Sequence, residues 1–176
     1  MLLFARRELL ARLCPQAQFH YVLHEGETGV ARNDIDHLPL LEAVERMDQV
    51  FQGPLNPEEE LDIGLFKLRI PRFPLEGVRE GVLNALTHRD YQNPGEVLVR
   101  HAAHELVITS PGGFMDGITP ENILRHEAVP RNRTLANALV KLRLVESSGI
   151  GRRRIFRSAL VYGKRRPEYV TDGFAV

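Results

Sequence analysis

The chain has 176 residues, of which 43% are hydrophobic and 26% charged, and its 23 Lys and Arg balance its 23 Asp and Glu. This composition is typical of a folded globular domain and excludes a disordered or fibrous protein. No apolar run approaches the roughly 18 residues that a membrane-spanning helix needs, so no membrane association is expected. The single cysteine, Cys14, excludes an internal disulfide and favours a reducing, cytoplasmic compartment.

Apolar patterning predicts helices and strands in the first part of the chain. Leucine recurs at helical spacing before Pro15, and apolar residues do so again before Gly53, while the segments between are rich in β-forming or alternating residues. In chain order, the predicted elements are a helix over 1–14, a strand over 19–24, a turn and a return strand within the polar stretch 26–36, a helix over 38–51 and a strand over 61–70.

A helix predicted over 75–88 carries the first candidate chemistry. Its apolar residues fall in one arc, while Glu76, Glu80, Asn84 and His88 follow at four-residue spacing on the opposite side. A carboxylate and a carboxamide one turn apart can hold a hydrated Mg²⁺ and polarise a water beside a triphosphate. The stripe therefore indicates a nucleotide site, and an ordinary solvent-facing helix side is the alternative.

The remaining chain predicts a β-hairpin, a glycine loop, several helices and a terminal hairpin. The second strand of the first hairpin leads into Ser110-Pro-Gly-Gly113, where adjacent glycines allow a ligand to approach the backbone closely. The predicted elements are strands over 97–100 and 105–109, helices from Thr119, over 132–145 and over 152–162, and strands over 168–171 and 174–176.

Positive charge is concentrated near the C-terminus. Residues 1–130 hold 12 Lys and Arg against 20 Asp and Glu, whereas residues 131–166 hold 11 against the single Glu146. Such a basic segment attracts phosphate, either that of a nucleotide or that of a nucleic-acid backbone. A basic surface that serves only solubility is the alternative.

Four motifs occur in the order and spacing of a known family. They are Glu80-Gly-Val-Leu-Asn84-Ala-Leu-Thr-His88-Arg-Asp-Tyr91, Ser110-Pro-Gly-Gly-Phe-Met-Asp-Gly-Ile-Thr-Pro-Glu-Asn122, Pro130-Arg-Asn132 and Leu144-Val-Glu-Ser-Ser-Gly-Ile-Gly151. Through them the chain resembles, from about residue 2 to 176, the ATP-binding domain that follows an AlbA-type (Schlafen-like) DNA-binding domain in bacterial and archaeal transcriptional regulators. That family is often labelled the C-terminal part of a RecG-like ATP-dependent DNA helicase, and it is related to the GHKL, or Bergerat-fold, ATPases.

The resemblance implies an α+β fold, a two-layer α/β sandwich in which helices cover one face of a mixed sheet and ATP lies among the helices. It implies that Glu80 orients or activates a water and that Asn84 binds Mg²⁺. Backbone N–H groups of glycine turns bind phosphate without a charged side chain, which fits two such turns at the nucleotide. Beyond Asn84, the implied nucleotide-binding residues are His88, then Ser110, Gly112 and Gly113 near the adenine, and Gly149 and Gly151 near the phosphates.

The sequence departs from the related ATPases in its first glycine box. Ser110, followed by Pro111, stands where they have an aspartate that accepts a hydrogen bond from the adenine amino group. This leaves the nucleotide's identity and its hydrolysis open. The family's DNA-binding domain is also missing, so we expect 1–176 to be one domain, a C-terminal fragment that would reach DNA through an N-terminal domain. The absence of a Walker A lysine motif and of helicase motifs argues against helicase activity.

The function expected from these features is that of a Mg-dependent, nucleotide-binding regulatory module of a bacterial transcriptional regulator. One alternative is nucleic-acid binding, because residues 139–154 also look like the second helix and the glycine-arginine wing of a winged-helix domain. The phosphate contacts of that alternative are Arg131, Arg133, Arg152, Arg153 and Arg154. A further alternative is a dimerisation scaffold that has kept the fold and lost the ligand, and homodimer formation stays open in either case.

Overall fold

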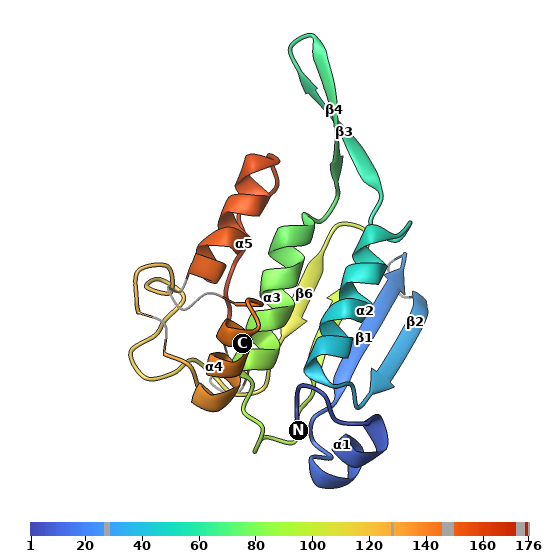
Figure 1. The fold of residues 1–176 in the computed structure, drawn as a ribbon. Coiled ribbons are helices and arrows are strands. Elements are labelled where there is room, and N and C mark those ends of the chain that lie inside the picture. The colour runs from blue at the N-terminus through green and yellow to red at the C-terminus, as the bar shows by residue number, and fades with distance from the viewer. Residues whose placement is uncertain (27–28, 128, 146–149, 172–174, 176) are drawn as a thin grey trace.

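The computed structural model describes residues 1–26, 29–127, 129–145, 150–171 and 175. Its framework is a four-stranded sheet in the order β2-β1-β5-β6 (Figure 1). The strands are β1 (Phe19–Glu25), β2 (Gly29–Asp36), β5 (Val97–His101) and β6 (Leu106–Thr109). The sheet is mixed, because β1 pairs antiparallel with β2 and parallel with β5, which in turn pairs antiparallel with β6.

Helices cover one face of this sheet. In Figure 1, α2 and α3 lie side by side against the sheet, and α5 lies on the far side of α3 from α2. The described helices are α1 (Arg7–Leu13), α2 (Leu40–Gln52), α3 (Leu75–His88), α4 (Arg133–Lys141) and α5 (Ile150–Val161). The predicted fold class, a two-layer α/β sandwich with a mixed sheet, is confirmed. None of the described helices is long and apolar enough to span a bilayer.

The core lies between the sheet and these helices. Alternate residues of β1 and β5 are buried, among them Tyr21 and Val99, whereas Arg100 on the opposite face is exposed. From the helical layer, Val82 and Leu83 of α3 are completely buried. Since a fully buried aliphatic side chain contributes roughly 1.5–3 kcal/mol, the apolar side of α3 fixes this helix on the sheet and leaves its polar side for other contacts.

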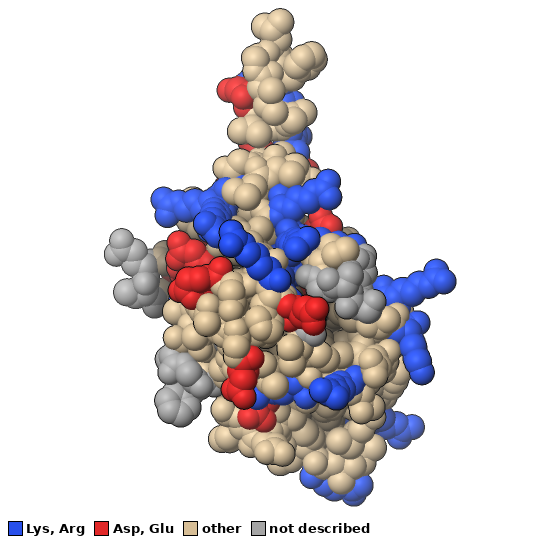
Figure 2. All heavy atoms as spheres, turned by 90° about the vertical axis from the view of Figure 1, so that its left-hand side faces the viewer, with Lys and Arg blue, Asp and Glu red and all other residues tan. Residues whose placement is uncertain are grey.

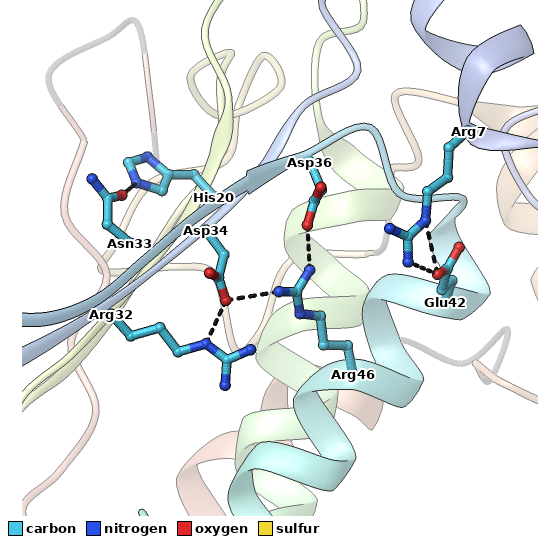
Figure 3. Close-up of polar contacts among 8 residues, drawn as sticks. All are labelled: Arg7, His20, Arg32, Asn33, Asp34, Asp36, Glu42 and Arg46. Carbon is cyan, nitrogen blue, oxygen red and sulfur yellow. Dashed lines mark hydrogen bonds and ion pairs between the residues drawn. The ribbon is translucent and has the colours of Figure 1, made fainter.

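Polar contacts orient α2 against the outer strand β2 (Figure 3). Arg46 donates to Asp34 at 2.7 Å and to Asp36 at 2.5 Å, and Arg7 from α1 pairs with Glu42 at the start of α2. Partly exposed ion pairs contribute little to stability, typically below about 1 kcal/mol each, so these contacts chiefly define orientation.

The structure corrects the single strand predicted over 61–70. A hairpin forms instead, with strands β3 (Glu58–Ile63) and β4 (Phe66–Pro71) joined at Gly64, whose φ of 59° lies in the left-handed region. Glycine adopts this conformation without steric cost, which is why the chain reverses there.

The helix predicted from Thr119 is also wrong. Residues 120–125 form turns, and the Asn122 side chain accepts a hydrogen bond from the Thr119 N–H and donates to the Gly117 carbonyl. These local side-chain bonds compete with a helical backbone. In the predicted terminal hairpin, residues 168–171 are not a strand, residues 174 and 176 lie outside the described chain, and Ala175 bridges to Pro111.

Candidate functional site

The middle of the polar side of α3 faces the protein interior. Glu80 is 3% exposed, and Asn84 and His88 are partly buried, whereas the Glu76 side chain one turn earlier is 60% exposed. The solvent-facing alternative therefore holds for Glu76 and fails for Glu80. The stripe predicted from four-residue spacing lies against α5 and the segments that flank it.

The carboxylate of Glu80 lies under the first turn of α5. Its Oε1 is 3.3 Å from Nη1 of Arg154 and 3.4 Å from Nη1 of Arg79. A Cβ built on Gly151 would lie 2.4 Å from Glu80 Oε2, closer than real contacts allow. The structure thus brings two predicted site residues together, and only a glycine at position 151 leaves room for the acid as it stands.

Asn84 and His88 continue this face one and two turns further along α3. Asn84 Nδ2 is buried and has no hydrogen-bond partner within the described chain. Because an unpaired buried donor costs about 1–3 kcal/mol, such a group usually has a functional or solvent explanation. Burial, reinforced by the positive charges of Arg152 and Arg131, lowers the pKa of His88 to about 4, so its imidazole is neutral at pH 7.

The first glycine loop is attached to the C-terminal part of α3. Ser110 is buried, and its hydroxyl donates to the Ala85 carbonyl at 2.7 Å. Gly112 has a φ of 92°, and a Cβ there would approach Cβ of Asp90 to 2.7 Å. The loop therefore packs against Ala85 and Asp90 at the end of α3, where the Ser110 hydroxyl is already hydrogen-bonded within the protein and Gly112 lies close to the Asp90 side chain.

Arg131 and Asn132 hold the loop against α3. Arg131 Nη2 donates to the Gly113 carbonyl at 2.5 Å, and Nδ2 of Asn132 is also committed to backbone acceptors. The carbonyls at the end of α3 that accept from these two side chains are those of Thr87, His88 and Arg89. Sequence reasoning missed this positioning role, although the motif Pro130-Arg-Asn132 was the signal that could have indicated it.

The predicted winged-helix wing is not formed by its described residues. Residues 150–154 open α5, and Gly149 lies outside the described chain. Arg152 donates to the His126 carbonyl at 2.9 Å, Arg153 approaches that of Leu124 at 3.4 Å, and Arg154 pairs with Glu80. The three arginines therefore bond within the domain, and only Arg133 and Arg153 of the five proposed nucleic-acid contacts are exposed.

Arg131 and Arg152 give the site a positive charge. Both lie close enough to His88 to lower its pKa, and neither forms an ion pair with a carboxylate of the described residues. Figure 2, which views the side of α4 and α5, shows Lys and Arg gathered over the upper part of this face, with Asp and Glu among them. An anionic ligand beside His88 would meet two guanidinium groups whose charge no carboxylate balances.

No group of three or more His, Cys, Asp or Glu side chains able to hold a metal ion occurs in the described part of the chain. Mg²⁺ is often bound through one or two protein oxygens together with substrate phosphates and waters. The side-chain oxygen of Asn84 fits that mode of binding, in which the nucleotide supplies most of the ligands.

His88 should make the domain less stable in mild acid. The pKa of His88 is about 4 when folded and near 6.5 when unfolded, so between these values the unfolded chain binds the extra proton. The free energy of unfolding therefore decreases as pH falls from 6.5 toward 4, by about 1–2 kcal/mol between pH 7 and pH 5. Urea denaturation at both pH values should show a smaller decrease for His88→Gln, and equal decreases would contradict the assignment.

Comparisons with known proteins agree with this architecture. Residues 95–176 match the family model described as "Putative ATP-dependent DNA helicase recG C-terminal". The match includes the glycine loop and α5 but not α3. The crystal structure of the DIP2311 protein from Corynebacterium diphtheriae is similar at 26% identity with a TM-score of 0.77, over 92% of this chain and 34% of that chain. No curated protein matches.

The family match confirms the sequence resemblance at the level of a RecG-like C-terminal, ATPase-like domain. The structural match extends over most of the chain, so the likeness of fold is wider than the family match. Since this chain spans only about a third of the DIP2311 chain, the likeness concerns one part of a longer protein.

Proposed function

We propose that this domain binds a nucleoside triphosphate together with Mg²⁺, and that ATP is the first ligand to test. The proposed site lies between α3, the loop 110–113 and the first turn of α5. The observation that carries the proposal is the inward-facing acid and amide of α3. Glu80 lies buried against Gly151, and the buried amide nitrogen of Asn84 has no hydrogen-bond partner among the described residues. Both residues belong to the motif that the related ATPases use for Mg-nucleotide.

The residues present fit such a ligand. Asn84 would hold Mg²⁺ through its amide oxygen, and Glu80 would orient a water. The guanidinium groups of Arg131 and Arg152 favour an anion near His88, whose neutral imidazole could donate one N–H to it. Ser110, Gly112 and Gly113 would line the base, and the N–H group of Gly151 would face phosphate, whereas Gly149, also predicted at the phosphates, lies outside the described residues.

The position of α5 suggests how binding would be transmitted. Gly151 and Arg154 cover the carboxylate of Glu80, so water can reach it from this side only if the first turn of α5 moves away from α3. A ligand that prefers the displaced arrangement shifts the population between two states and needs no hydrolysis to do so. This supports a regulatory module of a cytoplasmic bacterial transcriptional regulator whose DNA contact lies in another domain.

A melting experiment with matched variants tests the proposal. Mg-ATP at 100 times its Kd stabilises the folded state by about 2.7 kcal/mol, which corresponds to roughly 5–10 °C in Tm for a domain of this size. Asn84→Ala should abolish the rise while leaving the ligand-free Tm nearly unchanged, because it removes an unsatisfied buried donor. Differential scanning fluorimetry and calorimetric titration provide the measurements.

The control is Asn33→Ala. It removes an amide from β2, which is the edge strand at the other end of the sheet from β6. Asn33→Ala should keep the full rise in Tm. No rise for the native protein at millimolar Mg-ATP would contradict the proposal and favour the scaffold alternative. If Asn84→Ala and Asn33→Ala lost the rise in Tm equally, the assignment of the site to α3 would be contradicted.

A further inference from the structure

The β3–β4 hairpin is an arm that projects from the body of the domain (Figure 1). It leaves the helical layer between α2 and α3, and its two strands form a separate sheet in which they pair only with each other. An isolated two-stranded hairpin is at best marginally stable in water, so a long projecting one usually gains stability from a surface that packs on it.

The two faces of the arm are chemically opposite. On one face the register pairs Leu61 with Leu68 and Ile63 with Phe66. On the other face it pairs acid with base at two positions, Glu60 with Arg69 and Asp62 with Lys67. Alternation along a strand places successive side chains on opposite faces, so the outer part of the arm is an amphipathic ribbon with one apolar side, and Glu59 lies on that side only at the base.

The apolar side is exposed toward the tip, although Ile70 at its base is buried. Four large side chains at and near the tip are exposed, namely Ile63 at 52%, Leu65 at 100%, Phe66 at 73% and Leu68 at 46%. Because a large apolar side chain carries about 150–250 Å² of surface, they expose roughly 500 Å² on a narrow projection. Exposed apolar patches of this extent are typical of sites of association.

We propose that the arm packs its apolar face against the same face of the arm of a second copy of this chain. Such a contact is isologous and closes with two-fold symmetry. Two arms would bury about 1,000 Å², the lower limit for a specific interface, so the dimer is expected to be weak and concentration-dependent. Packing of two ribbons through their apolar faces is the arrangement found in β-sandwiches.

The charges of the arm favour a second copy over other partners. β3 carries Glu58, Glu59, Glu60 and Asp62, while β4 carries Lys67 and Arg69. Because the paired charges lie on the face opposite the apolar one, they remain in solvent when two apolar faces pack together, and no charge has to be buried. The excess of carboxylates disfavours nucleic acid and anionic lipid as the occupant.

Sedimentation velocity over a range of protein concentrations tests the dimer with two matched variants. Phe66→Gln and Lys67→Gln introduce the same side chain at adjacent positions on opposite faces of the arm. Phe66→Gln should weaken dimerisation at least tenfold, whereas Lys67→Gln should change the dimer Kd by less than about threefold. Because both side chains are exposed, neither variant should change the Tm of the monomer.

Cross-linking locates the contact. Ile63→Cys lies on the apolar face and Asp62→Cys on the charged face, and the native Cys14 is buried in the body. A short bifunctional thiol reagent should give a covalent dimer with Ile63→Cys and little with Asp62→Cys. A monomer at every concentration, a dimer that persists in Phe66→Gln, or equal cross-linking at both positions would overturn the proposal.

Discussion

Arg89→Ala is expected to lower the free energy of unfolding by about 3–5 kcal/mol, because it leaves a cavity in place of a buried side chain and removes the donor from three part-buried hydrogen bonds. Arg89 is only 1% exposed, although it is charged. Its guanidinium donates to the Gln18 carbonyl at 3.0 Å and also to the carbonyls of Gln16 and Gly95. One side chain thus joins the end of α3 to the segments that lead into β1 and β5.

Arg89→Lys keeps most of the aliphatic volume and one ammonium donor, but it cannot reproduce the fork of a guanidinium. We therefore expect roughly half the loss seen for alanine. The control is Arg69→Ala on the exposed arm, which should change stability by less than about 0.5 kcal/mol. Urea denaturation followed by circular dichroism measures all three, and a loss below 1 kcal/mol for Arg89→Ala would contradict the assigned role.

Local signals explain which elements the sequence predicts well. The helix predicted over 75–88 agrees with α3 residue for residue, because Pro74 precedes it and its apolar residues keep a helical period. The strand predicted over 61–70 fails for a local reason as well. Apolar residues continue through the reversal at Gly64, and no Asn-Gly or Asp-Gly pair marks the turn.

The candidate site is predicted less completely, since its contacts join residues far apart in the chain. Spacing along α3 groups Glu80 with Asn84, but the burial of Glu80 depends on α5, which begins 70 residues later. From the charge pattern alone, Arg131 is predicted to belong to a basic surface. In the structure its side chain donates to the carbonyl of His88, 43 residues earlier in the chain. A sequence read alone shows the chemistry of such groups and not their partners.

Gly151→Val is expected to lower the free energy of unfolding by about 2–3 kcal/mol, because its side chain would enter the space of the Glu80 carboxylate. Valine has the higher helix propensity, so any loss must come from the steric conflict. A second close approach of α3 and α5 lies at Gly77, where a Cβ would meet Ser158 Oγ at 2.4 Å. The two helices therefore approach each other closely at both positions.

A double-mutant cycle with Glu80→Ala isolates this conflict. In the Glu80→Ala background the carboxylate is gone, and Gly151→Val should cost less than about 1 kcal/mol, which gives a coupling free energy of about 1–2 kcal/mol. Urea denaturation of the four proteins measures it. If the two substitutions were additive, Gly151 would not lie on Glu80, and the enclosure of the acid between α3 and α5 would be refuted independently of any nucleotide.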